Sequence, residues 1–265
     1  MRSILGIDAA WTPTAGSGVA LAVEQGGRWR CAGLAPTFAE FEALAAGQAV
    51  DWDARPTSVG TLDAARLVAA ARALAPGMEL AVVAVDMPLS RQPITGRRPG
   101  DDEISRVFGG RGCGTHTPSD RRPGPIAAAL RDGFAAVGVP LRTNDGAEVR
   151  TPALLEVYPH TALLALTGDD YRVKYKASKT RTYWPGASLE DRQVKLAAEW
   201  RRVHRKLEVH LDTGLSLPGP RPFARLKRYE DALDALVCAW VGIEYLAGRT
   251  RPFGDADSAI WTPGA

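Results

Sequence analysis

Runs of apolar residues along the chain predict a sheet that begins near the N-terminus. Residues 4–8, 18–23 and 29–34 each have the composition of a strand, and Gln25-Gly26-Gly27 before the third is typical of a hairpin turn. The chain therefore opens with three successive strands, which we expect to form an antiparallel meander. Continuous apolar runs at 80–85 and 152–158 predict two further strands, the first buried on both faces.

Helical periodicity predicts the elements that cover this sheet. Thr37 and Glu40 have the spacing of a capping box, which marks the start of a helix. Gly248 directly follows the last helical pattern, where a glycine commonly ends a helix. Residues 88–125 are instead rich in Gly, Pro and Arg, which predicts a long insertion from the sheet, either a functional lid or a partly mobile segment. The predicted helices span 37–46, 62–74, 126–137, 161–166, 189–209 and 229–247.

The length of the chain allows one large domain or two small ones, and we expect a single domain over residues 1–265. Apolar residues make up 45% of the chain and charged residues 24%, which is ordinary for a soluble protein. The three cysteines form no Cys-x-x-Cys pair, which argues against a disulfide scaffold or zinc ribbon and suits the cytoplasm. No run approaches the roughly 18 apolar residues of a membrane span, so we expect no membrane partner. The sequence makes no prediction of oligomeric state.

Positive charge is concentrated between residues 171 and 206. This basic aromatic segment contains eleven Lys or Arg against three acids, although the net charge of the chain is only +3. Cations can follow a phosphate backbone while aromatic rings stack on bases, so the segment is a candidate surface for nucleic acid or another phosphate-bearing substrate. A solvated basic surface is the alternative. The candidate phosphate-binding residues are Lys174 and Lys176 here, and Arg98 and Arg111 in the insertion.

Four aspartates have the pattern of a divalent-metal site. Asp8 ends the first strand, Asp86 ends the 80–85 strand, and Asp231 and Asp234 lie one turn apart on the last helix. Two carboxylates about 4 Å apart repel by roughly 4 kcal/mol at an effective dielectric near 20, and a bridging Mg²⁺ or Mn²⁺ relieves that repulsion. Two such ions can activate a water and stabilise the leaving oxygen of a phosphodiester. The alternative is that these acids serve as turn, cap or helix-dipole residues.

The last helix has a face of small residues that supports this grouping. Asp231, Asp234, Ala235, Cys238 and Gly242 share one face by their spacing. Apart from the acids this face is small, so the helix can lie close to the sheet. We therefore expect Asp234 to come near Asp8.

Four motifs spread over the chain resemble the domain of unknown function 429 family, whose members are regarded as predicted nucleases of the RNase-H-like superfamily. The motifs are Gly6 to Trp11, Val85 to Leu89, Glu156 to Pro159 and Asp231 to Leu236. The resemblance implies an RNase-H-like mixed five-stranded α/β sheet, three antiparallel strands followed by parallel ones, flanked by helices. It also implies metal-binding acids at Asp8, Asp86 and Asp234, with Asp231 as a fourth candidate.

Three further residues have competing interpretations. Glu156 is a candidate metal ligand or general acid/base, and the alternative is a buried glutamate paired with an arginine. Cys113 and His116 could be a nucleophile and its base, but no third orienting group is evident and a lid that places arginines on phosphate is favoured. His160 could position a leaving group, although a helix-cap role is favoured.

The sequence thus predicts a metal-dependent hydrolase that cleaves phosphodiester bonds, a nuclease using Mg²⁺ or Mn²⁺. The alternative is a non-catalytic protein that binds nucleic acid or nucleotides and retains the fold. A phosphotransferase of actin-like architecture is disfavoured, because it requires two duplicated halves and glycine-rich phosphate loops, and we find no internal repeat.

Overall fold

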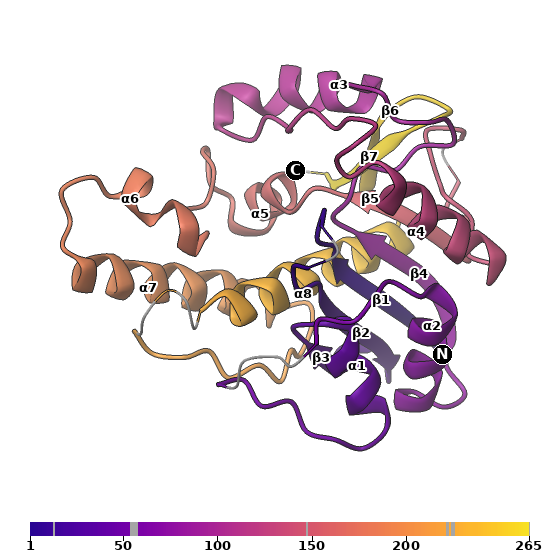
Figure 1. Cartoon of the computed structure of the whole chain (residues 1–265), viewed down its shortest axis with the longest axis horizontal. Helices are drawn as coiled ribbons and strands as arrows, with labels where there is room; N and C mark the ends of the chain where they lie inside the picture. Colours follow the sequence, from indigo (N-terminus) through magenta and orange to yellow (C-terminus); the bar gives the residue numbers. More distant parts are fainter. Residues whose placement is uncertain (13, 54–57, 147, 221–222, 224–225, 265) are drawn as a thin grey trace.

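A computed structural model describes residues 1–12, 14–53, 58–146, 148–220, 223 and 226–264. Within these residues, seven strands form one mixed sheet in the order β3-β2-β1-β4-β5-β7-β6 (Figure 1). The expected three antiparallel strands followed by parallel ones are present, but the sheet has seven strands instead of five. The strands are β1 (Arg2–Asp8), β2 (Gly18–Gln25), β3 (Arg28–Ala35), β4 (Glu79–Val85), β5 (Ala153–Val157), β6 (Thr250–Gly254) and β7 (Ala259–Pro263).

The N-terminal meander forms as predicted. β2 pairs antiparallel with both β1 and β3, and the turn between β2 and β3 contains Gly26 and Gly27. Both glycines have positive φ angles, +59° and +76°, which side-chain-bearing residues adopt only with strain. The Gly-Gly pair therefore fixes the hairpin.

The two strands beyond the five predicted lie at the C-terminal end of the chain. β7 runs parallel to β5, and β6 pairs antiparallel with β7 to form the outer edge of the sheet. β6 contains Arg251 and Pro252 and buries only Phe253, so it has no apolar run that a sequence pattern could detect. Its proline is tolerated because edge strands leave some N–H positions unpaired.

Helices cover both faces of the sheet (Figure 1). α1 (Phe38–Ala45), α2 (Ala64–Leu74) and α4 (Pro125–Ala136) share one apolar core with alternate residues of β1 and β4. α5 (Pro159–Thr167), α7 (Leu189–Leu207) and α8 (Lys227–Leu246) share the other. The 3-10 helix η2 (Ala177–Lys179) and α6 (Thr180–Tyr183) lie between α5 and α7 in sequence. In the part of the chain that the structure describes, no helix is both long and apolar enough to cross a lipid bilayer.

The insertion at 88–125 is more ordered than the sequence predicts. It contains the helix α3 (Pro99–Phe108) and the 3-10 helix η1 (Gly109–Arg111). Ile104 of α3 packs with Phe253 of β6 and Ile260 of β7 in a small third core. The helix was missed because few of its residues are apolar, and β6, on which it packs, has no apolar run either.

α8 lies very close to β1 and β2, as its small-residue face predicts. A Cβ placed on Gly6 of β1 would lie 2.2 Å from the Ala235 carbonyl oxygen, and one on Gly18 would lie 2.1 Å from that of Asp231. Gly242 similarly faces Ile4, whose Cγ2 would be 2.6 Å from an added Cβ. Side chains at these positions would hold the helix away from the sheet. The glycines therefore allow the acidic end of α8 to reach the end of β1.

Candidate functional site

Asp8 and Asp86 lie side by side at the ends of two paired strands. Ile7 of β1 is in register with Val85 of β4, and the Asp86 N–H donates to the Ile7 carbonyl at 2.9 Å. Ile7 and Val85 are buried on the face that α1, α2 and α4 cover. Because side chains alternate along a strand, Asp8 and Asp86 turn to the opposite face, where α8 lies.

α8 adds two buried acids to this pair. Asp231 is 4% exposed and Asp234 is fully buried. Burial raises the pKa of Asp8 well above its usual value, and the negative charge of Asp234 raises it further. The sequence prediction that Asp8, Asp86 and Asp234 converge is consistent with this arrangement.

Asp234 is held by two neighbouring residues of the basic aromatic segment. The Tyr175 hydroxyl donates to Asp234 Oδ1 at 2.7 Å, and the Lys176 ammonium donates to Oδ2. Lys176 Nζ also lies 3.7 Å from Glu230 Oε1. Burial lowers the pKa of Lys176, but the attraction of Asp234 and its neighbours outweighs this and the net pKa is raised. A charged lysine therefore lies among the acids.

A second lysine pairs with the other acids of α8. The Lys227 ammonium donates to Asp231 and lies 3.3 Å from Glu230 Oε1. The Ala177 N–H donates to Glu230 Oε2 at 2.6 Å, which fastens the segment after Lys176 to the helix. Sequence reasoning did not single out Lys227 or Glu230. The i, i+4 spacing of Lys227 and Asp231 is the sequence feature that could have predicted this ion pair.

The carboxylates of Asp8 and Asp86 differ from those of α8, because no described residue donates a hydrogen bond or forms an ion pair with them. Burial raises the pKa of Asp86 to about 7, with Lys176 lowering it and Asp234 raising it. Carboxylate oxygens suit hard cations such as Mg²⁺ and Mn²⁺. Over the described residues, however, no group of three or more His, Cys, Asp or Glu is arranged to hold a metal ion.

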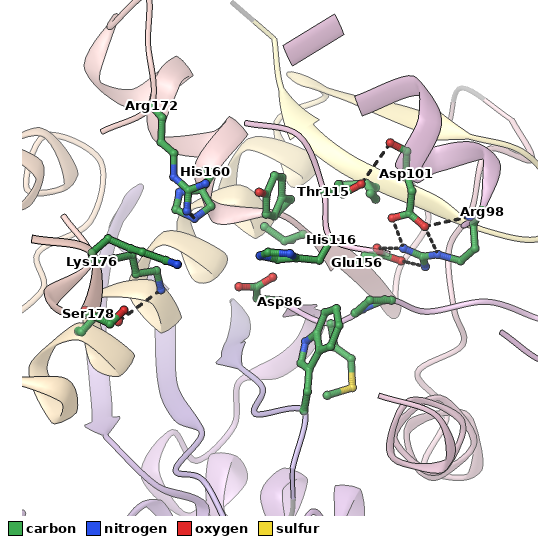
Figure 2. Close-up of a pocket in the computed structure, with 18 of the residues that line it drawn as sticks. Asp86, Arg98, Asp101, Thr115, His116, Glu156, His160, Arg172, Lys176 and Ser178 are labelled. Atoms are coloured by element: carbon green, nitrogen blue, oxygen red, sulfur yellow. Dashed lines mark hydrogen bonds and ion pairs between the residues drawn. The ribbon is translucent and has the colours of Figure 1, made fainter. Parts of the chain in front are cut away.

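A pocket of about 350 Å³, here called the acid pocket, opens beside Asp86 (Figure 2). Asp86 and Lys176 extend into it from different elements, and His116 enters it from the insertion. One cavity thus contains both the unpaired carboxylate of Asp86 and several groups that can bind phosphate. Its basic side chains include Arg172, Lys176, Lys179 and Lys227.

Glu156 has the role that the sequence analysis named as its alternative. It is in register with Val85, and it lines the acid pocket together with Asp86. Its oxygens accept from Arg98 at 2.6 and 2.7 Å and from the Leu89 N–H at 2.7 Å. Arg98 also bonds to Asp101 and the Leu89 carbonyl, which together with Glu156 accounts for all five of its N–H groups. Arg98 thus has no donor left for a phosphate in this arrangement.

Of the other predicted phosphate-binding residues, only Lys176 lines the acid pocket. Arg111 donates to the carbonyl oxygens of Asp169 and Asp170 at 2.7 and 3.1 Å, which ties the insertion to the end of α5. Lys174 is exposed and lines a neighbouring cavity instead. Arg172 and Lys179, which the sequence analysis did not select, are the basic residues of this segment that join Lys176 at the acid pocket.

His160 is paired with Arg172 and does not cap a helix. Tyr158 occupies the N-cap position of α5, with no side-chain capping bond. Arg172 Nη2 lies 2.5 Å from His160 Nε2, and burial together with the Arg172 charge holds the pKa of His160 well below its usual value. The imidazole is therefore neutral and its Nε2 accepts from the guanidinium. Its Nδ1 then carries the proton and has no partner among the described residues.

Cys113 and His116 do not form a nucleophile–base pair. The Cys113 side chain is fully buried, and its thiol donates to the His160 carbonyl at 3.6 Å. Burial raises the pKa of the thiol, which keeps it in the unreactive protonated form. His116 lines the acid pocket without a described contact to Cys113.

Comparison with known proteins identifies a family and no individual relative. No curated protein and no solved structure matches the chain. A family model described as "Protein of unknown function (DUF429)" matches residues 6–259, a span that contains every acid and base discussed above. The chain therefore belongs to the DUF429 family.

Proposed function

We propose that the protein is a metal-dependent hydrolase of phosphodiester bonds in nucleic acid, a nuclease of RNase-H-like type. One observation supports this most. The carboxylates of Asp8 and Asp86 lie on adjacent strand ends beside the buried acid Asp234, and no described cation pairs with them. Carboxylates that are close together, half-buried and unpaired are stabilised by a divalent cation.

The donor set fits Mg²⁺ or Mn²⁺ in its chemistry. Asp8 and Asp86 would hold the ion, and Asp234 is the adjacent third acid, at present bonded to Lys176. When bound, such an ion supplies a hydroxide from water at neutral pH and offsets the charge that develops on phosphate.

The chain's own residues would bind and orient the substrate around these acids. Lys176, Lys179 and Arg172 line the acid pocket and would attract a phosphate group to the carboxylate of Asp86, which lines the same pocket. Tyr175 fixes the orientation of Asp234 through its 2.7 Å hydrogen bond. The ion pair of Glu156 and Arg98 stabilises the loop after β4 that follows Asp86.

The test combines metal binding with hydrolysis. We expect Mn²⁺ to raise the melting temperature of the wild type and to support cleavage of a labelled oligonucleotide. The Asp8→Asn variant should lose both effects while remaining folded in metal-free buffer. Asp170→Asn is the matched control, because Asp170 is exposed and lies outside the acid pocket. If Asp8→Asn retains full Mn²⁺-dependent cleavage, the assignment is wrong.

A second candidate is a non-catalytic protein that binds nucleic acid. It is favoured by the ammonium groups of Lys176 and Lys227, which already neutralise Asp234 and Asp231 without a metal. This candidate predicts salt-dependent binding of nucleic acid, no cleavage, and no change in wild-type melting temperature with Mn²⁺. The same titration therefore separates the two functions.

A further inference from the structure

A second cavity adjoins the acid pocket and shares two basic residues with it. This side cavity has a volume of about 390 Å³ and is formed by the basic aromatic segment together with Gly112 of the insertion. Arg172 and Lys179 line both cavities. The remaining wall of the side cavity carries Tyr171, Lys174 and Tyr183. A ligand could therefore extend from Asp86 in the acid pocket past two cations to a pair of aromatic rings.

One buried polar atom beside the shared cations has no partner. The His160 Nδ1 has no hydrogen-bond partner among the described residues, and His160 is only 8% exposed and lines the acid pocket. Its Nε2 accepts from Arg172, which lines both cavities. Buried polar groups in proteins are nearly always paired, so an unpaired N–H donor at this place indicates a missing acceptor, which an anion would supply.

The aromatic side chains of the side cavity can contact a flat ring. Tyr171 is 61% exposed, although its ring lies against the insertion: a Cβ added to Gly112 would be 2.7 Å from the Tyr171 Cζ. Tyr183 packs edge-to-face on Trp184, with 5.7 Å between ring centroids, which limits its movement. Exposed aromatic rings beside cations are the usual platform for unpaired bases.

We propose that Arg172 and Lys179 bind the phosphate next to the one at Asp8 and Asp86, and that the side cavity receives the base attached to it. The substrate is then single-stranded nucleic acid, because a base in the side cavity cannot at the same time be paired in a duplex. This inference rests on the proposed nucleic-acid substrate, but it does not require that the protein cleave it.

Binding measured without metal tests this inference separately from hydrolysis. Fluorescence anisotropy in EDTA would follow a labelled single strand of about ten nucleotides, within the usual site size. DNA and RNA strands, an abasic strand and a duplex of the same length would be compared. The variants are Tyr171→Ala and Lys179→Gln, with Lys195→Gln as the control because Lys195 is exposed on α7 and lines neither cavity.

Tyr171→Ala should weaken binding of the base-bearing strand by about five- to a hundredfold, the range expected for loss of one stacked base. It should leave binding of the abasic strand unchanged. Lys179→Gln should weaken binding of both strands and reduce the salt dependence by about one phosphate contact. Lys195→Gln should have little effect. A dependence on Tyr171 with either DNA or RNA supports the proposal and identifies the polymer bound.

Three results would overturn the inference: no binding of any single strand, equal losses for base-bearing and abasic strands, or duplex binding as tight as single-strand binding. The two proposals fail in different ways. If Tyr171 matters for binding but no metal supports cleavage, the hydrolase proposal fails and the subsite remains. If Asp8-dependent cleavage occurs without any effect of Tyr171, only the subsite is wrong.

Discussion

Replacing Gly6 by alanine tests whether the close approach of α8 to β1 assembles the acids. A Cβ at this position would lie 2.2 Å from the Ala235 carbonyl oxygen and 2.5 Å from the Ala239 nitrogen. Both atoms belong to the backbone of a helix that is buried along almost its whole length, so no side chain can move aside. Ordinary contact begins near 3.4 Å, so α8 would have to retreat by 3.4 − 2.2, about 1.2 Å.

The cost follows from this displacement. Overpacking a well-packed core by one methyl group costs typically about 1–3 kcal/mol, and backbone contacts place Gly6→Ala at the upper end. Alanine also lowers the conformational entropy of the unfolded chain, which reduces this cost by about 0.4–1 kcal/mol. We therefore expect the free energy of unfolding to fall by roughly 2 kcal/mol, which lowers the melting temperature by about 4–8 °C in a chain of this size.

Urea unfolding followed by circular dichroism would measure this loss, and Mn²⁺ titration would report on the site. The retreat of α8 carries Asp234 away from Asp8, so the variant should also lose most of any Mn²⁺ stabilisation. Gly96→Ala is the control, because no atom lies within 4 Å of its added Cβ and its φ is not positive. Equal stabilities for the two variants would refute the claim that α8 contacts β1 at this distance.

Three further predictions concern the charges of the site. Burial raises the pKa of Asp86 from 3.8 to about 7, so the folded chain binds more protons than the unfolded chain between these values. The free energy of unfolding in metal-free buffer should therefore fall, by at most about 4 kcal/mol, as pH rises from about 4 to about 7. The melting temperature of Asp86→Asn should change less with pH over this range than that of the wild type. An equal pH dependence in both proteins would contradict a raised pKa for Asp86. Lys176→Met removes the ammonium from Asp234, so Mn²⁺ should raise the melting temperature of this variant more than that of the wild type; a smaller response would mean that the lysine does not compete with the ion. Glu156→Gln leaves the buried Arg98 without one of its carboxylate partners. The free energy of unfolding, measured in urea, should fall by about 3 kcal/mol. The Mn²⁺ response of Glu156→Gln should persist, and its loss would place Glu156 at the metal.

Several parts of the fold could be predicted because the signals are local. The Thr37 hydroxyl accepts from the Glu40 N–H at 3.1 Å, as the capping-box spacing predicts. Gly248 follows the end of α8 with φ at +70°, the left-handed conformation expected of a terminating glycine. The apolar run at 80–85 is the central strand β4. Each feature depends on residues within one turn or strand, so neighbours in sequence determine it.

Other parts were missed because their causes are distant in sequence. The edge strand β6 and the helix α3 bury few residues each; β6 depends on its pairing with β7, and α3 packs against both strands in the small third core. Glu156 could have been a ligand or a buried ion-pair partner, and the choice was made by Arg98, 58 positions away. Lys176 is equally distant from Asp234, with which it pairs. No periodicity records such pairings.

Local residue patterns were enough to place acids at two strand ends and on one face of the last helix, because strand and helix periods follow from neighbours in the chain. What surrounds these acids depended on how the elements pack in three dimensions. The register of Ile7 with Val85 aligned Asp8 with Asp86. The missing side chain at Gly6 let α8 lie close enough to β1 to bring Asp234 near these two acids. The packing of the basic aromatic segment against α8 then placed Lys176 among these acids. Register and packing depend on the whole buried interface, and that is why the charge balance of the site emerges only when the chain is folded.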